Sequence, residues 1–129
     1  TISIPFGKPK QFEEIYQIVY DANRSALHNG SKNNTGSELD QLARSHISSK
    51  NYGDYFTHRL GHGIGLEVHE EPYIVGNNNY NLKIGNCHTI EPGIYLPNKF
   101  GIRIEDDVVV TKNGIELLYD TPRFNFDHI

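Results

Sequence analysis

The sequence contains a single cysteine, Cys87, so no disulfide bond can form within the chain. A lone cysteine is typical of a reducing compartment, and we therefore expect a cytoplasmic protein. No apolar run approaches the roughly 18 residues of a membrane-spanning helix, and no basic stretch followed by an apolar segment predicts a signal peptide. Methionine is absent, and the chain opens on Thr-Ile-Ser-Ile, which is typical of the middle of a strand. These two features favour a part of a longer chain.

The sequence also lacks a large excess of charge of either sign. The net charge is −4 over 129 residues, of which 22% are charged. Such a mildly acidic surface argues against nucleic acid or an anionic membrane as a main partner. The length suits one domain, and the apolar share of 36% is below the usual level but periodic enough to build a core.

The periodicity of the apolar residues predicts two helices followed by strands. Apolar residues recur at three- and four-residue spacing over Pro9–His28, which indicates an amphipathic helix. A second helix is expected from Thr35, where Glu38 completes a capping box, to about Asn51. The expected strands are Thr1–Pro5, Phe56–Leu60, Leu66–His69, Cys87–Glu91, Gly93–Leu96, Ile102–Thr111 and Ile115–Tyr119, with a tight turn at Asn113-Gly114. This pattern predicts an α+β fold with two helices covering one face of a mainly antiparallel sheet.

A histidine cluster follows the second predicted helix. His58, His62 and His69 fall within twelve residues. His58 and His62 have the spacing of a helical zinc pair, but glycines at positions 61, 63 and 65 disfavour a helix. Glycines around a histidine let the backbone approach a ligand or ion closely, and in a strand His58 and His62 would share a face. The alternative is three partly buried histidines with ordinary hydrogen-bond partners; the glycines favour a functional cluster.

Two acidic positions accompany these histidines. Glu91 lies between an apolar strand and a Pro-Gly turn, and strand alternation places Arg103, Glu105 and Asp107 on one face. A carboxylate on a strand is often simply solvated. Here the apolar flanks indicate a buried or cleft-facing position, where a carboxylate costs several kcal/mol unless a cation compensates it. A metal ion would compensate Glu91 and Glu105 together.

The chemistry of this donor set narrows the choice of metal. One imidazole and several carboxylates make a hard site, which favours Mn²⁺, Co²⁺, Fe²⁺ or Zn²⁺ in a two-metal arrangement over a thiolate zinc site. Two such ions typically lie about 3.5–4 Å apart. Because three protein ligands cannot fill two coordination spheres, we expect further carboxylates from elsewhere.

Three ordered motifs then run through the second half of the chain: His58-x3-His62-Gly-Ile-Gly-Leu-Glu-Val-His69-Glu, Thr-Ile-Glu91-Pro-Gly-Ile-Tyr and Gly-Ile-Arg103-Ile-Glu105-Asp-Asp. Together they closely resemble the proline-peptidase branch of the pita-bread (M24-type) metallopeptidases, the Xaa-Pro dipeptidases and aminopeptidases P. The resemblance covers essentially the whole chain. It implies that residues 1–129 form an incomplete half of a pita-bread fold. This half would be the C-terminal portion of the catalytic domain, without the N-terminal domain and the first metal-ligand strands.

The resemblance also implies a set of metal ligands. The family uses two aspartates, one histidine and two glutamates, and by motif position His62, Glu91 and Glu105 match the last three. The two aspartates would precede Thr1. The implied cofactor is a pair of divalent ions, Mn²⁺ or Co²⁺ first, with Zn²⁺ or Fe²⁺ as alternatives. His69 would hydrogen-bond the scissile carbonyl and stabilise the oxyanion, and Glu91 would also shuttle protons.

Further roles carry over by position. His58 would line the site and contact the proline or carboxylate side of the substrate. Arg103 would pair with carboxylates or orient the substrate through its fork of donors. Tyr95 would contact and orient the residues that bind the metals or the substrate, without binding either itself. His88 stands where relatives commonly have an apolar residue, and we expect it to face away from the metals.

The activity implied is hydrolysis of Xaa-Pro bonds in dipeptides or short peptides by a metal-bridging hydroxide, in a full-length homodimer. For the isolated chain we expect weak metal binding and no peptidase activity. One alternative is a methionine aminopeptidase, although these enzymes generally lack the Arg103-x-Glu105 pattern. Another is a non-catalytic pita-bread protein that binds peptides or proteins, although such relatives usually lose ligands.

Overall fold

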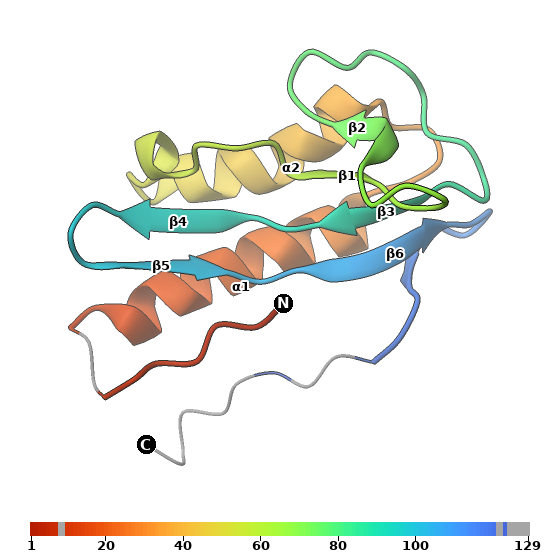
Figure 1. The fold of residues 1–129 in the computed structure, drawn as a ribbon. Helices are drawn as coiled ribbons and strands as arrows, with labels where there is room; N and C mark the ends of the chain where they lie inside the picture. Colours follow the sequence, from red (N-terminus) through yellow and green to blue (C-terminus); the bar gives the residue numbers. More distant parts are fainter. Residues whose placement is uncertain (8–9, 121–122, 124–129) are drawn as a thin grey trace.

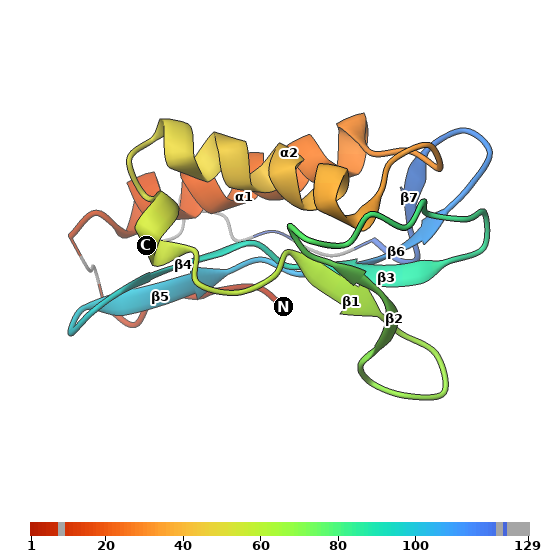
Figure 2. The same cartoon turned by 90° about the horizontal axis from the view of Figure 1, so that it is seen from above.

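A computed structural model describes residues 1–7, 10–120 and 123. Two helices, α1 (Phe12–Asn29) and α2 (Gly36–Ser49), lie side by side over one face of a layer of antiparallel strands, as predicted (Figure 1). The view from above shows the helices on one side of the sheet only (Figure 2). The other elements are a short 3-10 helix η1 (Gly53–Tyr55) and strands β1 (Gly61–Gly63), β2 (Glu70–Ile74), β3 (Cys87–Ile90), β4 (Gly93–Leu96), β5 (Phe100–Arg103), β6 (Asp106–Val110) and β7 (Ile115–Leu117).

The strands form two sheets. Five strands pair in the order β2-β1-β3-β6-β7, and β4 pairs with β5 in a separate two-stranded sheet. Every pairing is antiparallel. The core lies between this layer and the helices, because the apolar faces of both helices are buried against the inner faces of the strands. Within the described residues, no helix is both long enough and apolar enough to cross a membrane.

The predicted helices are confirmed. In α1 the apolar stripe Ile15, Val19, Ala22 and Ala26 is fully buried. The predicted start at Pro9 lies outside the described residues. Gly30 follows the last turn in extended conformation, and a Cβ there would lie 2.5 Å from Ile115 Cδ1. Close packing rather than a left-handed cap therefore requires this glycine.

The predicted capping box opens α2. The Glu38 amide donates to Thr35 Oγ1 at 3.1 Å, and the Thr35 amide donates to Glu38 Oε2 at 2.8 Å. These two bonds satisfy amide groups that a helix start leaves without partners. They fix the first turn of α2, whose buried face then includes Leu39, Ala43 and Ile47.

Two of the predicted strands are not strands in the structure. Residues 56–60 form no strand, and the first strand begins at Gly61. Residues 66–69 form an exposed loop between β1 and β2, with Leu66 and Val68 in solvent. Both predictions rested on short β-like runs between glycine, proline and asparagine residues, but such a run forms a strand only where another strand pairs with it.

Other strand predictions need adjustment. The predicted strand 102–111 is divided at residues 104–105, where the Ile104 amide donates to Pro92 O at 3.3 Å and the Glu105 amide to Thr1 O at 2.9 Å. Residues 1–5 do not form a regular strand, although Thr1 exchanges backbone bonds with Glu105. The turn at Asn113-Gly114 is confirmed, since it joins β6 to β7 and Gly114 has a φ of 147°.

Candidate metal centre

Three separate parts of the strand layer bring the predicted ligands together. His62 lies in the middle of β1, Glu91 follows β3, and Glu105 lies between β5 and β6. One ligand atom from each side chain can be chosen so that all three lie within 4.8 Å of one another. This is the spacing that a shared cation requires. Within the described part of the chain, it is the one group of histidine, cysteine and acidic residues with such geometry.

The glycines on either side of His62 allow close packing of the strands. A Cβ at Gly61 would lie 2.0 Å from the Thr89 carbonyl oxygen, and one at Gly63 would lie 2.3 Å from Glu71 O. Strand β1 is therefore held tightly between β3 and β2, and no side chain fits at these two positions. The two glycines thus help to place His62 by letting the neighbouring strands approach.

Thr89 links two of the candidate ligands and was missed by the sequence analysis. Its hydroxyl accepts a hydrogen bond from the His62 amide at 3.1 Å and donates one to Glu91 Oε1 at 3.0 Å. The hydroxyl thus fixes the backbone of one ligand and the carboxylate of the other. Its place two residues before Glu91 in the predicted strand Cys87–Glu91 was the signal that could have identified it.

The protonation of His62 tests whether a cation fits. His62 Nδ1 lies 3.0 Å from the Gly63 carbonyl oxygen, which only accepts, so Nδ1 carries the proton. In the neutral imidazole, Nε2 then presents its lone pair to Glu91 Oε1 at 3.2 Å. Two acceptors this close repel unless a proton or a cation lies between them. His62 and Glu91 are only 5% and 9% exposed, so water screens this repulsion poorly, and the donor set fits a divalent metal ion.

Glu91 has one charged neighbour, and Glu105 has one hydrogen-bond donor beside it. Arg103 Nη1 lies 3.9 Å from Glu91 Oε2. Glu105 Oε2 accepts a hydrogen bond from the Thr1 hydroxyl. The Arg103 side chain is more than one-third exposed, so it compensates the Glu91 carboxylate only in part.

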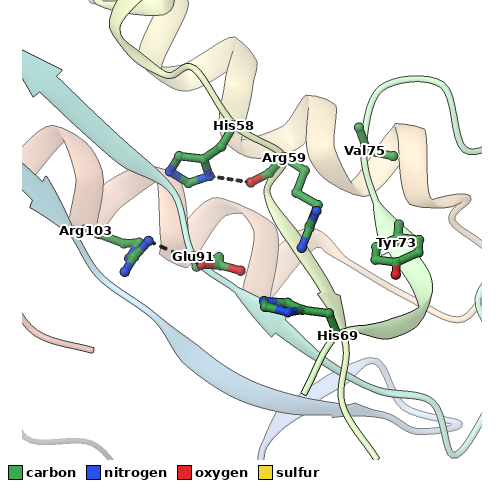
Figure 3. Close-up of a pocket in the computed structure, with 7 residues that line it drawn as sticks. All are labelled: His58, Arg59, His69, Tyr73, Val75, Glu91 and Arg103. Carbon is green, nitrogen blue, oxygen red and sulfur yellow. Dashed lines mark hydrogen bonds and ion pairs between the residues drawn. The ribbon is translucent and has the colours of Figure 1, made fainter. Parts of the chain in front are cut away.

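A cavity of about 630 Å³ opens beside the cluster. Figure 3 shows the side chains around it, with Glu91 between Arg103 and His69. Its lining residues are His58, Arg59, His69, Tyr73, Val75, Glu91 and Arg103. Of the three candidate ligands, only Glu91 also lines the cavity. The structure thus brings the predicted substrate-binding residues His58, His69 and Arg103 around one cavity, next to the predicted metal ligands.

His69 lies against His62 although the two come from different elements. Their ring centroids are 4.2 Å apart, with the ring planes at 67°. His69 ends the loop that leads into β2 and is exposed. It therefore reaches both the cavity and the candidate metal ligand, as its predicted role requires.

His58 is arranged differently from the prediction. It does not share a strand face with His62. Its Nδ1 donates to Arg59 O at 2.7 Å, so Nε2 accepts from the Tyr95 hydroxyl at 3.0 Å. Burial raises the pKa of Tyr95, although Arg103 opposes the effect, so the hydroxyl stays protonated and can donate. Tyr95 was expected to support the site, and the structure gives it this contact.

Three cavity residues were not foreseen: Arg59, Tyr73 and Val75. The Arg59 guanidinium lies 5.1 Å from the centre of the Tyr73 ring, within the range of a cation–π contact. Arg59 follows His58 directly, which could have marked it. Tyr73 and Val75 lie in and after β2, and nothing in their local sequence distinguishes them from ordinary core residues.

His88 lies on the other face of the sheet. It is directly opposite Val108 in the β3–β6 pair, and Asp106, two residues from Val108, bonds to Arg24 of α1. His88 therefore faces the helices, on the side of the sheet away from the candidate metal ligands, while its neighbour Thr89 faces the cluster. Burial lowers the pKa of His88, so its ring stays neutral.

Comparison with known proteins agrees with this geometry. Residues 1–112 match the family model of metallopeptidase family M24. The chain is 44% identical over 124 residues to an uncharacterized peptidase, YqhT, of Bacillus subtilis, covering 95% of this chain and 35% of that protein. It is 49% identical over 119 residues to an uncharacterized peptidase of Staphylococcus epidermidis, covering 92% and 34%.

Solved structures give the same result. A prolidase from Pyrococcus furiosus superimposes with a TM-score of 0.91 at 46% identity, covering 95% of this chain and 36% of that one. An X-Pro aminopeptidase from Thermotoga maritima gives 0.87 at 46% identity, covering 96% and 34%. The chain spans about a third of the length of these relatives. The fold is thus that of the prolidases over this third, and the chain belongs to metallopeptidase family M24.

Proposed function

We propose that the whole protein is a metal-dependent peptidase that hydrolyses Xaa-Pro bonds in dipeptides or short peptides. The observation that carries this proposal is the pair of acceptors His62 Nε2 and Glu91 Oε1, 3.2 Å apart beside Glu105 at the edge of a cavity. The solved relatives described as prolidase and X-Pro aminopeptidase supply the substrate class. The chain matches a third of each, so the activity is proposed for the whole protein.

In this proposal His62, Glu91 and Glu105 hold one or both of two divalent ions, with Mn²⁺ or Co²⁺ favoured over Zn²⁺ or Fe²⁺ by the oxygen-rich donor set. When bound, the metal supplies Lewis acidity toward the peptide carbonyl and lowers the pKa of a water molecule. The remaining carboxylate ligands come from the part of the whole protein outside residues 1–129.

Two residues act on protons and developing charge. Glu91 lies between the cluster and the cavity, where its carboxylate can accept a proton from the attacking water and pass it to the leaving amine. His69 lines the same cavity beside His62, and a ring N–H directed at the scissile carbonyl stabilises the oxyanion. A single such donor contributes about 3 kcal/mol in characterised enzymes.

Two further residues orient the substrate. Arg103 keeps donors available for a substrate carboxylate, because its contact with Glu91 is a single one at 3.9 Å. His58 presents no free ring nitrogen, so it acts through packing, or through Nε2 once the substrate displaces the Tyr95 hydroxyl. In both cases the imidazole forms part of the cavity wall that would contact the proline of the substrate.

The direct test is peptidase activity of the whole protein on Xaa-Pro dipeptides with Mn²⁺ or Co²⁺. We expect metal-dependent turnover, abolished by chelation and reduced by at least about 100-fold in His62→Ala, because a buried ligand is lost. His28→Ala is the matched control, since His28 is exposed on α1, and it should retain full activity. Full activity in His62→Ala, or no action on any Xaa-Pro peptide, would contradict the proposal.

A further inference from the structure

The segment that carries His58 has no regular secondary structure. Residues 56–60 connect η1 to β1, and Phe56 and Leu60 at its two ends are buried, at 3% and 0% exposed. The yellow-green chain at this point runs alongside α2 in Figure 1. Buried backbone groups need hydrogen-bond partners. Backbone groups supply two partners, since the Phe56 amide donates to Gly53 O at 3.1 Å and Leu60 O accepts from the Glu91 amide at 2.8 Å. Further partners come from side chains.

Two side chains of α2 supply these partners. Arg44 Nη1 donates to Phe56 O at 2.9 Å, and Arg44 Nη2 donates to His58 O at 2.8 Å. Asp40 Oδ1 accepts from the Leu60 amide at 2.9 Å. Three alternate residues of the segment are thus bonded to one turn of helix, in the way that a neighbouring strand would bond them.

Asp40 and Arg44 also hold each other. Arg44 Nε lies 2.7 Å from Asp40 Oδ2, and Nη2 lies 3.0 Å from Oδ1, a two-point contact at i,i+4 spacing. Asp40 is 1% exposed, so its charge requires this partner. The guanidinium also lies 4.2 Å from the centre of the Phe56 ring. These contacts together hold the planar Arg44 guanidinium in one orientation.

We propose that Asp40 and Arg44 are positioning residues that set where His58 stands in the cavity. Neither lines the cavity, so they act through the backbone of residues 56–60. The two carbonyl bonds lie on either side of residue 57 and fix the direction in which the His58 ring leaves the chain, toward Tyr95. The consequence for substrate binding rests on the proposed function; the positioning itself does not.

Arg44→Lys separates positioning from charge. Lysine keeps a positive charge opposite Asp40 but cannot bond Asp40 and both carbonyls at once. Ile47→Val is the matched control, because Ile47 is a fully buried residue of the same helix whose side chain has no hydrogen-bonding group to offer the segment, and its truncation lowers stability. We expect both variants to keep the fold, and their melting temperatures show how far each is destabilised.

The readout is the imidazole of His58 in the whole protein, followed by NMR with ¹⁵N-labelled histidine. We expect Arg44→Lys to lose the cross-peaks between the His58 and Tyr95 rings and to mix the two His58 tautomers. Ile47→Val should keep both signals at an equal or larger loss of melting temperature. Unchanged His58 signals in Arg44→Lys, or the same loss in Ile47→Val, would overturn the proposal.

Whole-protein kinetics give a second readout. In Arg44→Lys we expect KM for an Xaa-Pro dipeptide to rise by about tenfold at unchanged metal content, since His58 and not the metal cluster is displaced. If the whole protein proves inactive on Xaa-Pro peptides, the proposed function fails while the NMR result still decides the positioning role. A fall in metal content without a change in His58 would count against positioning.

Discussion

His62 and His88 lie on neighbouring strands of one sheet and share the same local arrangement, yet their surroundings differ completely. Each ring donates Nδ1 to the carbonyl of the following residue, at 3.0 Å in both cases. Each is almost fully buried. The difference lies at Nε2, which faces the Glu91 carboxylate in His62 and has no hydrogen-bond partner among the described residues in His88.

The comparison shows what marks a candidate metal ligand in this fold. Burial and a fixed tautomer are common to both histidines, so neither feature identifies the ligand. Only His62 has a second acceptor, the Glu91 carboxylate, opposite its Nε2 lone pair. A cation between the two acceptors would remove their repulsion. His88 lies on the helix-facing side of the sheet, where burial lowers its pKa and keeps the ring neutral.

The largest effect is expected from a change that separates β1, which carries His62, from β3, which carries His88. Gly61→Ala places a Cβ 2.0 Å from the Thr89 carbonyl oxygen, so β1 must move away from β3. We expect a loss of about 4 kcal/mol in the free energy of unfolding, measured with urea. Gly76→Ala is the control, because the nearest atom is 4.0 Å away, and it should change stability little. Equal effects at the two positions would show that the strand contact is not needed.

Metal affinity separates the two histidines directly. In the whole protein, His62→Ala should weaken Mn²⁺ binding by at least about 100-fold, as measured by calorimetry, since one ligand of the cluster is removed. His88→Leu should leave the affinity unchanged, because this ring lies on the opposite face of the sheet. If His88→Leu weakened binding as strongly, the distinction between the two faces would fail.

A smaller effect is expected from the hydroxyl that links His62 to Glu91. Thr89→Val keeps the shape of the side chain but leaves the His62 amide without its partner. We expect a loss of about 1–3 kcal/mol in stability and about tenfold weaker metal binding. Thr111→Val serves as a control, since its hydroxyl bonds only within the β6–β7 turn region. It should leave metal affinity intact.

The smallest effect is a pH dependence assigned to His88. Burial lowers its pKa in the folded state, so the unfolded chain binds more protons as the pH falls below about 6.5. Stability should therefore fall with decreasing pH, at up to about 1.4 kcal/mol per pH unit from this residue. His88→Leu should flatten the dependence between about pH 6.5 and 5, measured by urea unfolding at each pH. An unchanged slope would assign the acid sensitivity to other groups.

Much of this architecture was predictable from local patterns. The helices followed from apolar spacing and from the capping box at Thr35, and the three candidate ligands followed from short motifs. These features depend on residues that are neighbours along the chain or along one element. The structure brings His62, Glu91 and Glu105 together as those motifs implied.

The remainder depends on contacts between distant elements. Residues 56–60 were predicted to form a strand, but three of their backbone groups bond to two side chains on α2, which no local pattern indicates. The break at residues 104–105 depends on Pro92, on the other side of the β4–β5 hairpin, and on Thr1, about a hundred residues earlier. Tyr73 and Val75 became cavity residues only through the placement of β2 beside β1.

Glu91 is the one candidate ligand that also lines the cavity, and this has a thermodynamic consequence. In the proposed enzyme a single carboxylate then takes part in both cation binding and peptide binding, so the two equilibria are coupled. Linkage requires the coupling to be reciprocal: whatever factor the cation contributes to peptide affinity, the peptide contributes to cation affinity. Titrating either one at several fixed concentrations of the other would measure the coupling free energy carried through this residue.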